Sequence, residues 1–287
     1  MSSMSGGIEV DICVIGAGSG GLSVAAGASQ LGASVALVER RLMGGDCLNF
    51  GCVPSKALLA AGKSAHNIAG AARFGITSAA PGIDQKAVRQ HVRDVIAAIA
   101  PHDSIERFRA LGVNVILGAA RFTGPREIQV DGQTIRARRF VVATGSSPVV
   151  PAIPGLDGVP YLTNETLFEY DQPMAHLIVI GGGPIGVEMS QAHRRLGVAV
   201  TLIEKTRLLP KDDPELTQVV HDRLVSEGVE VMTGIGVEGV AAEGSGAAVQ
   251  LDNGASVSGS HLLVATGRKA NVEGLNLEAA GIDYGRR

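Results

Sequence analysis

The chain has 287 residues, of which 45% are hydrophobic and 18% charged, and its formal net charge is −3. This length allows two domains of ordinary size, and the composition is typical of a soluble α/β protein rather than a disordered one. A slightly acidic chain with only 3% aromatic residues offers neither a basic surface nor stacking platforms, which argues against nucleic-acid binding.

Residues 12–38 carry no charge, and the stretch is long enough to cross a bilayer. It contains six glycines, however, and divides into strand, glycine turn, helix and strand, so we expect no membrane association. The N-terminal sequence MSSMSGGIEVD lacks a basic segment before an apolar one, which argues against a secretory leader. We therefore expect a cytoplasmic protein, in which a close cysteine pair is catalytic or metal-binding.

One pattern occurs twice, at residues 10–40 and 175–205. In each copy an apolar β-branched run ends in G-x-G-x-x-G, a helix is expected next, and a second apolar run ends in a glutamate 23 residues after the first glycine. The glycines allow a tight turn, close approach of the backbone to a pyrophosphate and close helix–strand packing. The helix N-terminus then offers N–H groups to the diphosphate. The predicted nucleotide-site residues are Gly16, Gly18, Gly21 and Glu39 in the first copy and Gly181, Gly183, Gly186 and Glu204 in the second.

At each copy taken alone, the alternative is an ordinary βα turn in which glycine serves only packing. The repetition of the whole pattern argues against this alternative. Two dinucleotide sites suggest a flavin and a nicotinamide that exchange a hydride. Glu204 suits a free ribose 2′-hydroxyl and repels a 2′-phosphate, which favours NAD(H) over NADP(H). Lys205 and Arg207 lie close by in the sequence and weaken that preference.

The repeat continues downstream with Asp-Gly (131–132) and Asn-Gly (253–254) hairpin signals and with the matching segments FVVATGS and LLVATGR. Helices are expected over 54–72 and 85–111, the latter broken near Pro101, and the proline-rich stretch 148–160 is expected to link two domains. We predict an α/β protein with two Rossmann-like domains of three-layer ββα type. The expected division is an FAD-binding domain with the cysteine pair (1–150), an NAD(P)-binding domain (151–270) and a return toward the FAD domain (271–287).

Cys47 and Cys52 lie in the stretch GGDCLNFGCVPSK, directly before the helix expected from residue 54. A metal site would require further Cys or His at ligand spacing, and no histidine pairs with these cysteines in the sequence, so we expect no metal. Two buried structural thiols are an alternative, since cysteine often serves as a small hydrophobe. A redox disulfide explains more, because a helix N-terminus and the nearby Lys56 both favour a thiolate, most strongly at Cys52.

The order of these features resembles the class I pyridine nucleotide–disulfide oxidoreductases, which include dihydrolipoyl dehydrogenase, glutathione reductase and mercuric reductase. GGDCLNFGCVPSKALL looks like the redox-active signature of that family, and the resemblance extends over residues 8–287, with mercuric-reductase-like members the most similar. It implies that Cys52 lies against the flavin and that Cys47 attacks the substrate disulfide. Lys56 would lie near the flavin and pair with Glu188, which faces the nicotinamide.

The resemblance also implies further cofactor contacts. FAD would be held additionally by Gly45, Asp46, Ala119, Thr144 and Gly145, and the nicotinamide cofactor by Gly267. Asp46 departs from the family pattern, which usually has Thr there, and a carboxylate beside a diphosphate is unfavourable unless it is compensated.

Family members have a second FAD-binding segment and a C-terminal dimerisation domain, for which this sequence has no counterpart. That domain supplies the histidine base to the partner subunit. We therefore expect a truncated form of a homodimeric reductase, with weak flavin retention and poor turnover of a small-molecule or protein disulfide. The alternatives are an NADH oxidase or diaphorase and an inactive nucleotide-binding fragment.

Overall fold

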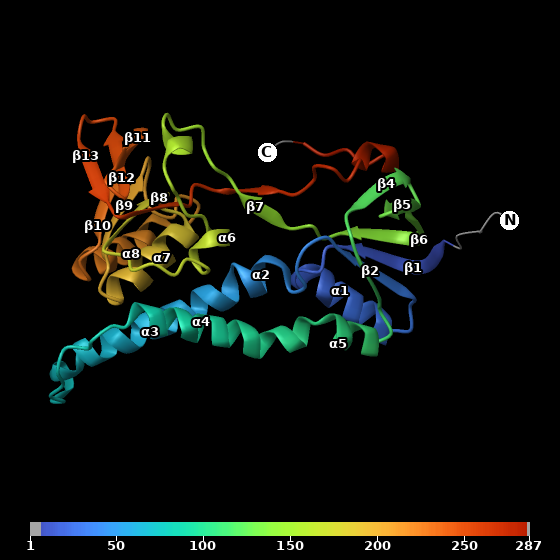
Figure 1. Ribbon diagram of the computed structural model, residues 1–287, viewed down its shortest axis with the longest axis horizontal. Helices are drawn as coiled ribbons and strands as arrows, with labels where there is room; N and C mark the ends of the chain where they lie inside the picture. Colours follow the sequence, from blue (N-terminus) through green and yellow to red (C-terminus); the bar gives the residue numbers. More distant parts are fainter. Residues whose placement is uncertain (1–6, 286–287) are drawn as a thin grey trace. The chain divides into compact units, whose positions relative to one another are not determined.

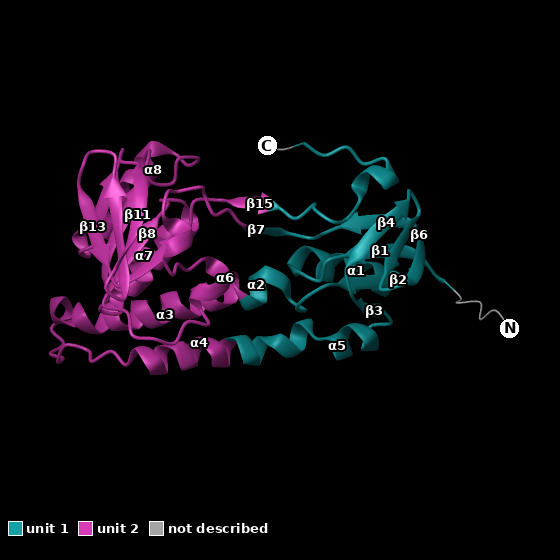
Figure 2. Ribbon diagram, turned by 45° about the horizontal axis from the view of Figure 1, so that its top comes forward, with its two compact units in different colours: residues 1–49, 96–147, 270–287 teal, residues 50–95, 148–269 magenta. Residues whose placement is uncertain are grey.

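The computed structural model describes residues 7–285 (Figure 1). Residues 1–6, on which the prediction of no secretory leader partly rests, and the last two residues lie outside this range. The chain folds into two compact units (Figure 2). Unit 1 comprises residues 1–49, 96–147 and 270–287, and unit 2 comprises residues 50–95 and 148–269.

Unit 1 is built on a six-stranded sheet with the order β3-β2-β1-β6-β5-β4. The first four of these strands are mutually parallel, and β5 and β4 continue the sheet in antiparallel fashion. The strands are β1 (Ile8–Ile15), β2 (Val35–Glu39), β3 (Asn114–Leu117), β4 (Ala120–Gly124), β5 (Glu127–Val130) and β6 (Gln133–Val142). The Asp-Gly pair turns the chain between β5 and β6, as predicted.

The sheet of unit 1 has an apolar core on each face because its central strands are buried on both sides. On one face, Val14 and Leu37 pack with Leu22 of α1 (Ser19–Gln30) and Phe108 of α5 (Ile105–Ala110). On the other face, Cys13 and Val38 belong to a cluster with the hairpin strands β4 and β5. That cluster also includes side chains from the segment around the short helix η4 (Leu277–Ala280).

Unit 2 has three layers. Its four-stranded parallel sheet has the order β10-β9-β8-β14, and an antiparallel sheet β11-β12-β13 packs on one face of it. The strands are β8 (His176–Ile180), β9 (Ala199–Glu204), β10 (Glu230–Thr233), β11 (Val237–Glu243), β12 (Gly246–Leu251), β13 (Ser256–Gly259) and β14 (His261–Val264). Helices α7 (Pro184–Arg195) and α8 (Pro214–Ser226) contact the parallel strands.

The remaining elements belong to connections and to the helical part of unit 2. Helix α3 (Cys52–Ala69) packs along α7. The others are α2 (Gly45–Asn49), η1 (Ala71–Phe74), α4 (Gln85–Ile99), η2 (Ala100–Asp103), β7 (Ser146–Pro148), η3 (Leu156–Gly158), α6 (Asn164–Leu167) and β15 (Arg268–Ala270). Strands β7 and β15 pair as a two-stranded ribbon.

The predicted α/β class with Rossmann-like sheets is confirmed. The helix predicted over 54–72 is α3, and the predicted break near Pro101 separates α4 from α5. The stretch predicted as a linker is packed in part, because Leu156 and Val159 are buried in the core of unit 2. Among the described residues no helix is long and apolar enough to cross a membrane.

Candidate functional site

The first glycine turn follows β1 in unit 1. Gly16 has φ of +105°, and a Cβ there would collide with the carbonyl of Ala143, so only glycine fits. A side chain at Gly21 would collide with the carbonyl oxygen of Gly16. The turn is therefore packed so closely that the start of α1 lies directly beside the end of β1, which is the arrangement of a dinucleotide cradle.

The N-terminus of α1 has backbone donors available. Gly18 caps the helix in an extended conformation without a side-chain hydrogen bond. The loop of Gly44 and Gly45 lies against it, because the Gly44 N–H donates to Ala17 O at 2.9 Å and a Cβ on Gly45 would lie 2.6 Å from the Gly18 Cα. The predicted contacts Gly18 and Gly45 therefore meet in one place, and this helix start can receive a diphosphate.

Glu39 ends β2, and only 8% of it is exposed. Its two oxygens accept hydrogen bonds from the backbone N–H groups of Ala17, at 2.6 Å, and Arg41, at 2.7 Å. It borders a cleft with a volume of about 120 Å³. The cleft is lined by residues that include Gly16, Glu39, Gly118, Ala119, Thr144 and Asn271.

Asn271 was not predicted, and it holds the Thr144–Gly145 turn in place. Its side-chain amide donates to Thr144 O at 3.0 Å, and its oxygen accepts from Ser147 Oγ at 2.9 Å. Its backbone N–H donates to Gly145 O, and its carbonyl accepts from Thr144 Oγ1. The sequence signal was a single Asn four residues after the glycine of the second ATG segment, too short a pattern to interpret alone.

The second glycine turn, in unit 2, has the same construction. Gly181 has φ of +113°, and a Cβ there would collide with Ala265 O. A side chain at Gly186 would collide with Gly181 O. Gly183 caps α7 without a side-chain bond, and Pro184 occupies the first helical position, where a missing N–H costs nothing.

Glu204 repeats the role of Glu39 in unit 2. It accepts from the Gly182 N–H at 2.7 Å and from the Thr206 N–H at 2.9 Å. The cleft beside it has a volume of about 440 Å³, and its lining residues include Glu204, Lys205, Glu238 and Asp252. Arg207 bonds instead to Thr217 Oγ1 and to the carbonyls of Pro210 and Asp212.

Cys52 is the first residue of α3, and it is exposed. The N-cap, Gly51, makes no side-chain hydrogen bond, so α3 presents its N-terminal N–H groups beside the thiol. Lys56 lies one turn further along the same helix face. Its ammonium group bridges both oxygens of Glu188 on α7, at 2.6 and 2.7 Å.

A close crossing of α3 and α7 positions this pair. A Cβ on Gly62 would lie 3.2 Å from Ala192 O, so the small residue lets the helix backbones approach. One turn beyond, Arg195 makes two bonds to Glu227, at 2.6 and 2.7 Å, and the Glu227 side chain is only 5% exposed. Burial raises the pKa of Glu227, but the Arg195 guanidinium outweighs it and holds that pKa below its ordinary value.

The other cysteines occupy different surroundings. Cys47 is half-buried in the short helix α2, together with Asp46 in its first turn. Cys13 is fully buried in β1, and burial raises the pKa of its thiol to about 12. No group of three or more potential metal ligands occurs among residues 7–285.

The structure thus brings the predicted residues together in three places. Gly16, Gly18, Gly21, Glu39 and Gly45 surround the start of α1, with Ala119 and Thr144 in the adjoining cleft. Gly181, Gly186 and Glu204 form the matching turn of unit 2, where Gly267, exposed, accepts a hydrogen bond from Val149. Lys56 and Glu188 form the third group.

Comparisons with known proteins agree with this geometry. Residues 10–287 match the family described as pyridine nucleotide-disulphide oxidoreductase. A mercuric reductase of Streptomyces lividans is 37% identical over 96% of this chain and 60% of its own length. A dihydrolipoyl dehydrogenase of Thermus scotoductus is 38% identical over 96% of this chain and 61% of its own length.

Solved structures show the same similarity. The HOCl-induced flavoprotein disulfide reductase RclA from Escherichia coli superimposes with a TM-score of 0.84 at 26% identity. The superposition covers 96% of this chain and 61% of RclA. The chain spans about half to three fifths of the length of the relatives it matches. The matched residues nonetheless include both glycine turns, the cysteine pair and Glu188, and the chain belongs to the pyridine nucleotide-disulphide oxidoreductase family.

Proposed function

We propose that this chain performs the electron-transfer chemistry of an FAD-dependent NAD(P)H:disulfide oxidoreductase. The observation that carries the proposal is the pair of matched glycine turns, each with a glutamate whose carboxylate accepts two backbone N–H bonds. The same chain places Cys52 at the start of α3. Family membership supports FAD as the flavin. The cofactor-binding, catalytic and domain assignments made from the sequence are part of this proposal.

The residues of unit 1 fit the nucleotide part of FAD. Gly16 and Gly21 have no space for a side chain, and because glycine has none, a pyrophosphate can approach the backbone of the turn closely. The start of α1, which has no side-chain cap, offers N–H donors to that pyrophosphate. Glu39 already holds two backbone N–H groups and has further lone pairs for ribose hydroxyls. When bound, FAD supplies the hydride-accepting chemistry that the side chains of the protein lack.

The residues of unit 2 fit NADH better than NADPH. Three carboxylates, Glu204, Glu238 and Asp252, and one cation, Lys205, line the cleft. A 2′-phosphate would meet net negative charge there. Arg207, which weakened the preference in the sequence, is bonded to its own loop and to α8.

Lys56 and Glu188 act as a positioned ion pair. Two short bonds to Glu188 hold the Lys56 ammonium group in place, one turn from Cys52. Glu188 lies on α7, the helix that follows the second glycine turn.

In the proposed reaction, reduced Cys47 attacks one sulfur of a substrate disulfide and the other substrate sulfur leaves as a thiol. Cys52 then attacks Cys47, which releases the second substrate thiol and forms the Cys47–Cys52 disulfide.

Spectroscopy of the purified chain tests the proposal. We expect the chain, incubated with FAD and desalted, to show flavin absorbance that NADH bleaches without oxygen. Cys47→Ser should abolish NADH-dependent reduction of a small disulfide while reduction of ferricyanide continues. The matched control, Cys13→Ala, alters only the buried thiol of β1 and should retain both activities.

Other results would support the alternatives. If disulfide reduction persists in the Cys47→Ser variant, electrons leave from the flavin, as in a diaphorase. A colourless chain that binds NADH and cannot be reconstituted with FAD would be a nucleotide-binding module. A homodimeric full-length protein and a cytoplasmic location stay predictions of the sequence.

A further inference from the structure

Two turns follow neighbouring strands of the sheet in unit 1. The strand order places β2 and β3 on one side of β1 and β6 on the other, and these four strands are parallel. Ligands of open α/β sheets bind outside the carboxyl ends of the strands, at the point where the strand order reverses. Here that point lies between β1, which the Gly16 turn follows, and β6, which the Thr144–Gly145 turn follows.

The two turns are in direct contact. The Ala143 N–H donates to Ile15 O at 2.8 Å. A Cβ on Gly16 would collide with the carbonyl of Ala143 and would lie 3.1 Å from the Cα of Thr144. A pyrophosphate that approaches the Gly16 turn therefore also approaches the backbone that follows Ala143.

The N–H group of Gly145 is an unused donor in this second turn. Gly145 has φ of +68°, a conformation that favours glycine. Its N–H makes no hydrogen bond to any residue between 7 and 285. Free backbone N–H groups in turns are common contacts for the oxygens of bound anions, so Gly145 offers one more such contact beside the cradle.

The side chain of Asn271 fixes the direction of this N–H group. Its Nδ2 donates to Thr144 O at 3.0 Å, and its Oδ1 accepts from Ser147 Oγ at 2.9 Å. The amide cannot be reversed, because its oxygen would then face a carbonyl oxygen, which only accepts. In a trans peptide the C=O and N–H groups point in opposite directions, and the described residues contain no cis peptide. By bonding to Thr144 O, Asn271 therefore also sets the direction of the Gly145 N–H.

The backbone of Asn271 bonds to the same turn. Its N–H donates to Gly145 O, and its carbonyl accepts from Thr144 Oγ1 at 2.6 Å. These two bonds do not depend on the identity of the side chain, so they are retained when Asn271 is substituted. The substitution removes only the bond that orients the Thr144–Gly145 peptide and the bond to Ser147.

We propose that Asn271 is a positioning residue for FAD, whose amide orients the Thr144–Gly145 peptide so that the Gly145 N–H donates to an oxygen of the cofactor. The inference rests on the proposed function, because it takes FAD as the molecule bound at the Gly16 turn. Asn271 and Thr144 both line the cleft that Glu39 borders. Without the amide the peptide can rotate, and only the fraction of molecules with the correct orientation binds FAD fully.

Titration of the full chain with FAD tests the proposal. Asn271→Leu has nearly the same shape and removes both side-chain bonds without adding a charge. We expect its FAD dissociation constant to rise about tenfold, as if the peptide were correctly oriented in about a tenth of the molecules. Ser147→Ala removes only the donor to Oδ1 and should raise the constant about twofold, the effect of one weak hydrogen bond.

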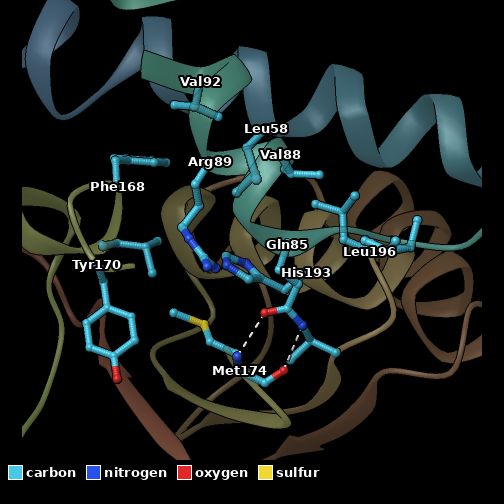
Figure 3. Close-up of a pocket in the computed structure, with 13 residues that line it drawn as sticks. Leu58, Gln85, Val88, Arg89, Val92, Phe168, Tyr170, Met174, His193 and Leu196 are labelled. Carbon is cyan, nitrogen blue, oxygen red and sulfur yellow. Dashed lines mark hydrogen bonds between the residues drawn. The ribbon is translucent and has the colours of Figure 1, made fainter. Parts of the chain in front are cut away.

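Gln85 provides a matched control in unit 2 (Figure 3). Its side-chain oxygen accepts from the Met174 N–H at 2.8 Å, and its NH₂ group donates to Met174 O at 2.9 Å, as the dashed lines show. Gln85→Met therefore also removes an amide that bonds to the backbone of a distant segment. It should lower the unfolding temperature about as Asn271→Leu does, and it should leave the FAD dissociation constant unchanged.

Hydrogen exchange measures the Gly145 N–H directly, by mass spectrometry of peptides that span residues 143–147. In the unaltered chain, FAD should slow the exchange of this amide, because a free donor becomes bonded. In Asn271→Leu, saturating FAD should slow it much less. A purely structural role of Asn271 would change the unfolding temperature and leave this protection intact.

Each contrary result has a distinct meaning. If Asn271→Leu binds FAD as tightly as the unaltered chain, the inference is wrong and the proposed function stands. Equal losses of affinity in Asn271→Leu and Gln85→Met would assign the effect to general destabilisation. Unchanged exchange of Gly145 in the FAD complex would show that its N–H does not contact the cofactor. If the unaltered chain binds no FAD, the proposed function is wrong and this inference fails with it.

Discussion

The two glycine turns are built around the same backbone clamp, one in each unit. Glu39 accepts from the N–H groups of Ala17 and Arg41, at 2.6 and 2.7 Å, and Glu204 from those of Gly182 and Thr206, at 2.7 and 2.9 Å. In each turn the third glycine lies against the carbonyl of the first. The repeated sequence has thus produced a repeated local structure, down to the atoms that each carboxylate holds.

The surroundings of the two turns differ. In unit 1 the Gly44–Gly45 loop lies against the start of α1, and Glu39 is buried. In unit 2 the cleft is larger, about 440 against 120 Å³, and Glu204 is only half-buried. The comparison suggests that one turn suits a cofactor that stays bound and the other suits one that exchanges.

Matched glycine substitutions should have the largest effects. Gly21→Ala and Gly186→Ala each place a Cβ against a carbonyl oxygen, which forces the helix away from the strand. We expect Gly21→Ala to lose FAD binding, and Gly186→Ala to retain flavin but lose reduction by NADH. Flavin absorbance after desalting and stopped-flow bleaching by NADH measure the two effects.

Gly20→Ala is the control, because nothing lies within 4 Å of a Cβ at that position of α1. It should retain flavin and NADH reduction. If Gly186→Ala removed the flavin and Gly21→Ala did not, the assignment of the two turns would be reversed.

The ion pair between α3 and α7 should affect the rate of flavin reduction strongly and the stability of the fold only slightly. The Lys56 and Glu188 side chains are 60% and 36% exposed, and such pairs contribute about 0–1 kcal/mol to folding. Lys56→Met should therefore leave thermal unfolding nearly unchanged. We expect flavin reduction by NADH to slow by about tenfold to a hundredfold, because misplaced groups in an active site cost rate on this scale.

Lys63→Met is a suitable control, since Lys63 is exposed on the same helix. A large loss of unfolding temperature in Lys56→Met, with no loss of rate, would make the pair a structural contact only.

Glu204→Gln tests the proposal that the second cleft favours NADH over NADPH. Glutamine keeps an oxygen for a backbone N–H group but removes the charge that opposes a 2′-phosphate. We expect the ratio of kcat/KM for NADH over NADPH to fall about tenfold, or 1.4 kcal/mol. Glu243→Ala, on an exposed part of β11, should leave the ratio unchanged. An unchanged ratio in Glu204→Gln would mean that Glu238 and Asp252, and not Glu204, cause the preference for NADH.

Sequence patterns predicted those parts of the site that depend on local contacts. The glycine spacing, the terminal glutamates and the helix after Cys52 are each fixed within a short segment, so their geometry follows from the backbone alone. Asn271 could not be predicted, because it bonds to Thr144, which is 127 residues away.

A smaller effect is expected at Asp46, in the first turn of α2. A carboxylate at this position favours the helix but opposes a nearby diphosphate. Asp46→Thr should therefore tighten FAD binding about threefold, as a surface electrostatic effect of under 1 kcal/mol. Titration of the apoprotein with FAD measures this, and weaker binding in the variant would show that Asp46 assists the flavin.

Cys13 provides the subtlest comparison between the repeats, because Ile178 occupies the equivalent position of β8 and both side chains are fully buried. Burial raises the pKa of the Cys13 thiol from 9.0 to about 12, so the folded protein keeps this thiol protonated while the unfolded chain ionises it. The contribution of this thiol to the free energy of unfolding is therefore complete below pH 9, and it decreases above pH 9 by about 1.4 kcal/mol per pH unit.

Cys13→Ala leaves a cavity and should therefore lower the free energy of unfolding at pH 8, and by less at pH 10, as measured by urea unfolding. Ile178→Val has no thiol to ionise and should cost the same at both values. Equal penalties at pH 8 and pH 10 in Cys13→Ala would show that the thiol is open to ionisation, and a third reactive cysteine would then have to be considered.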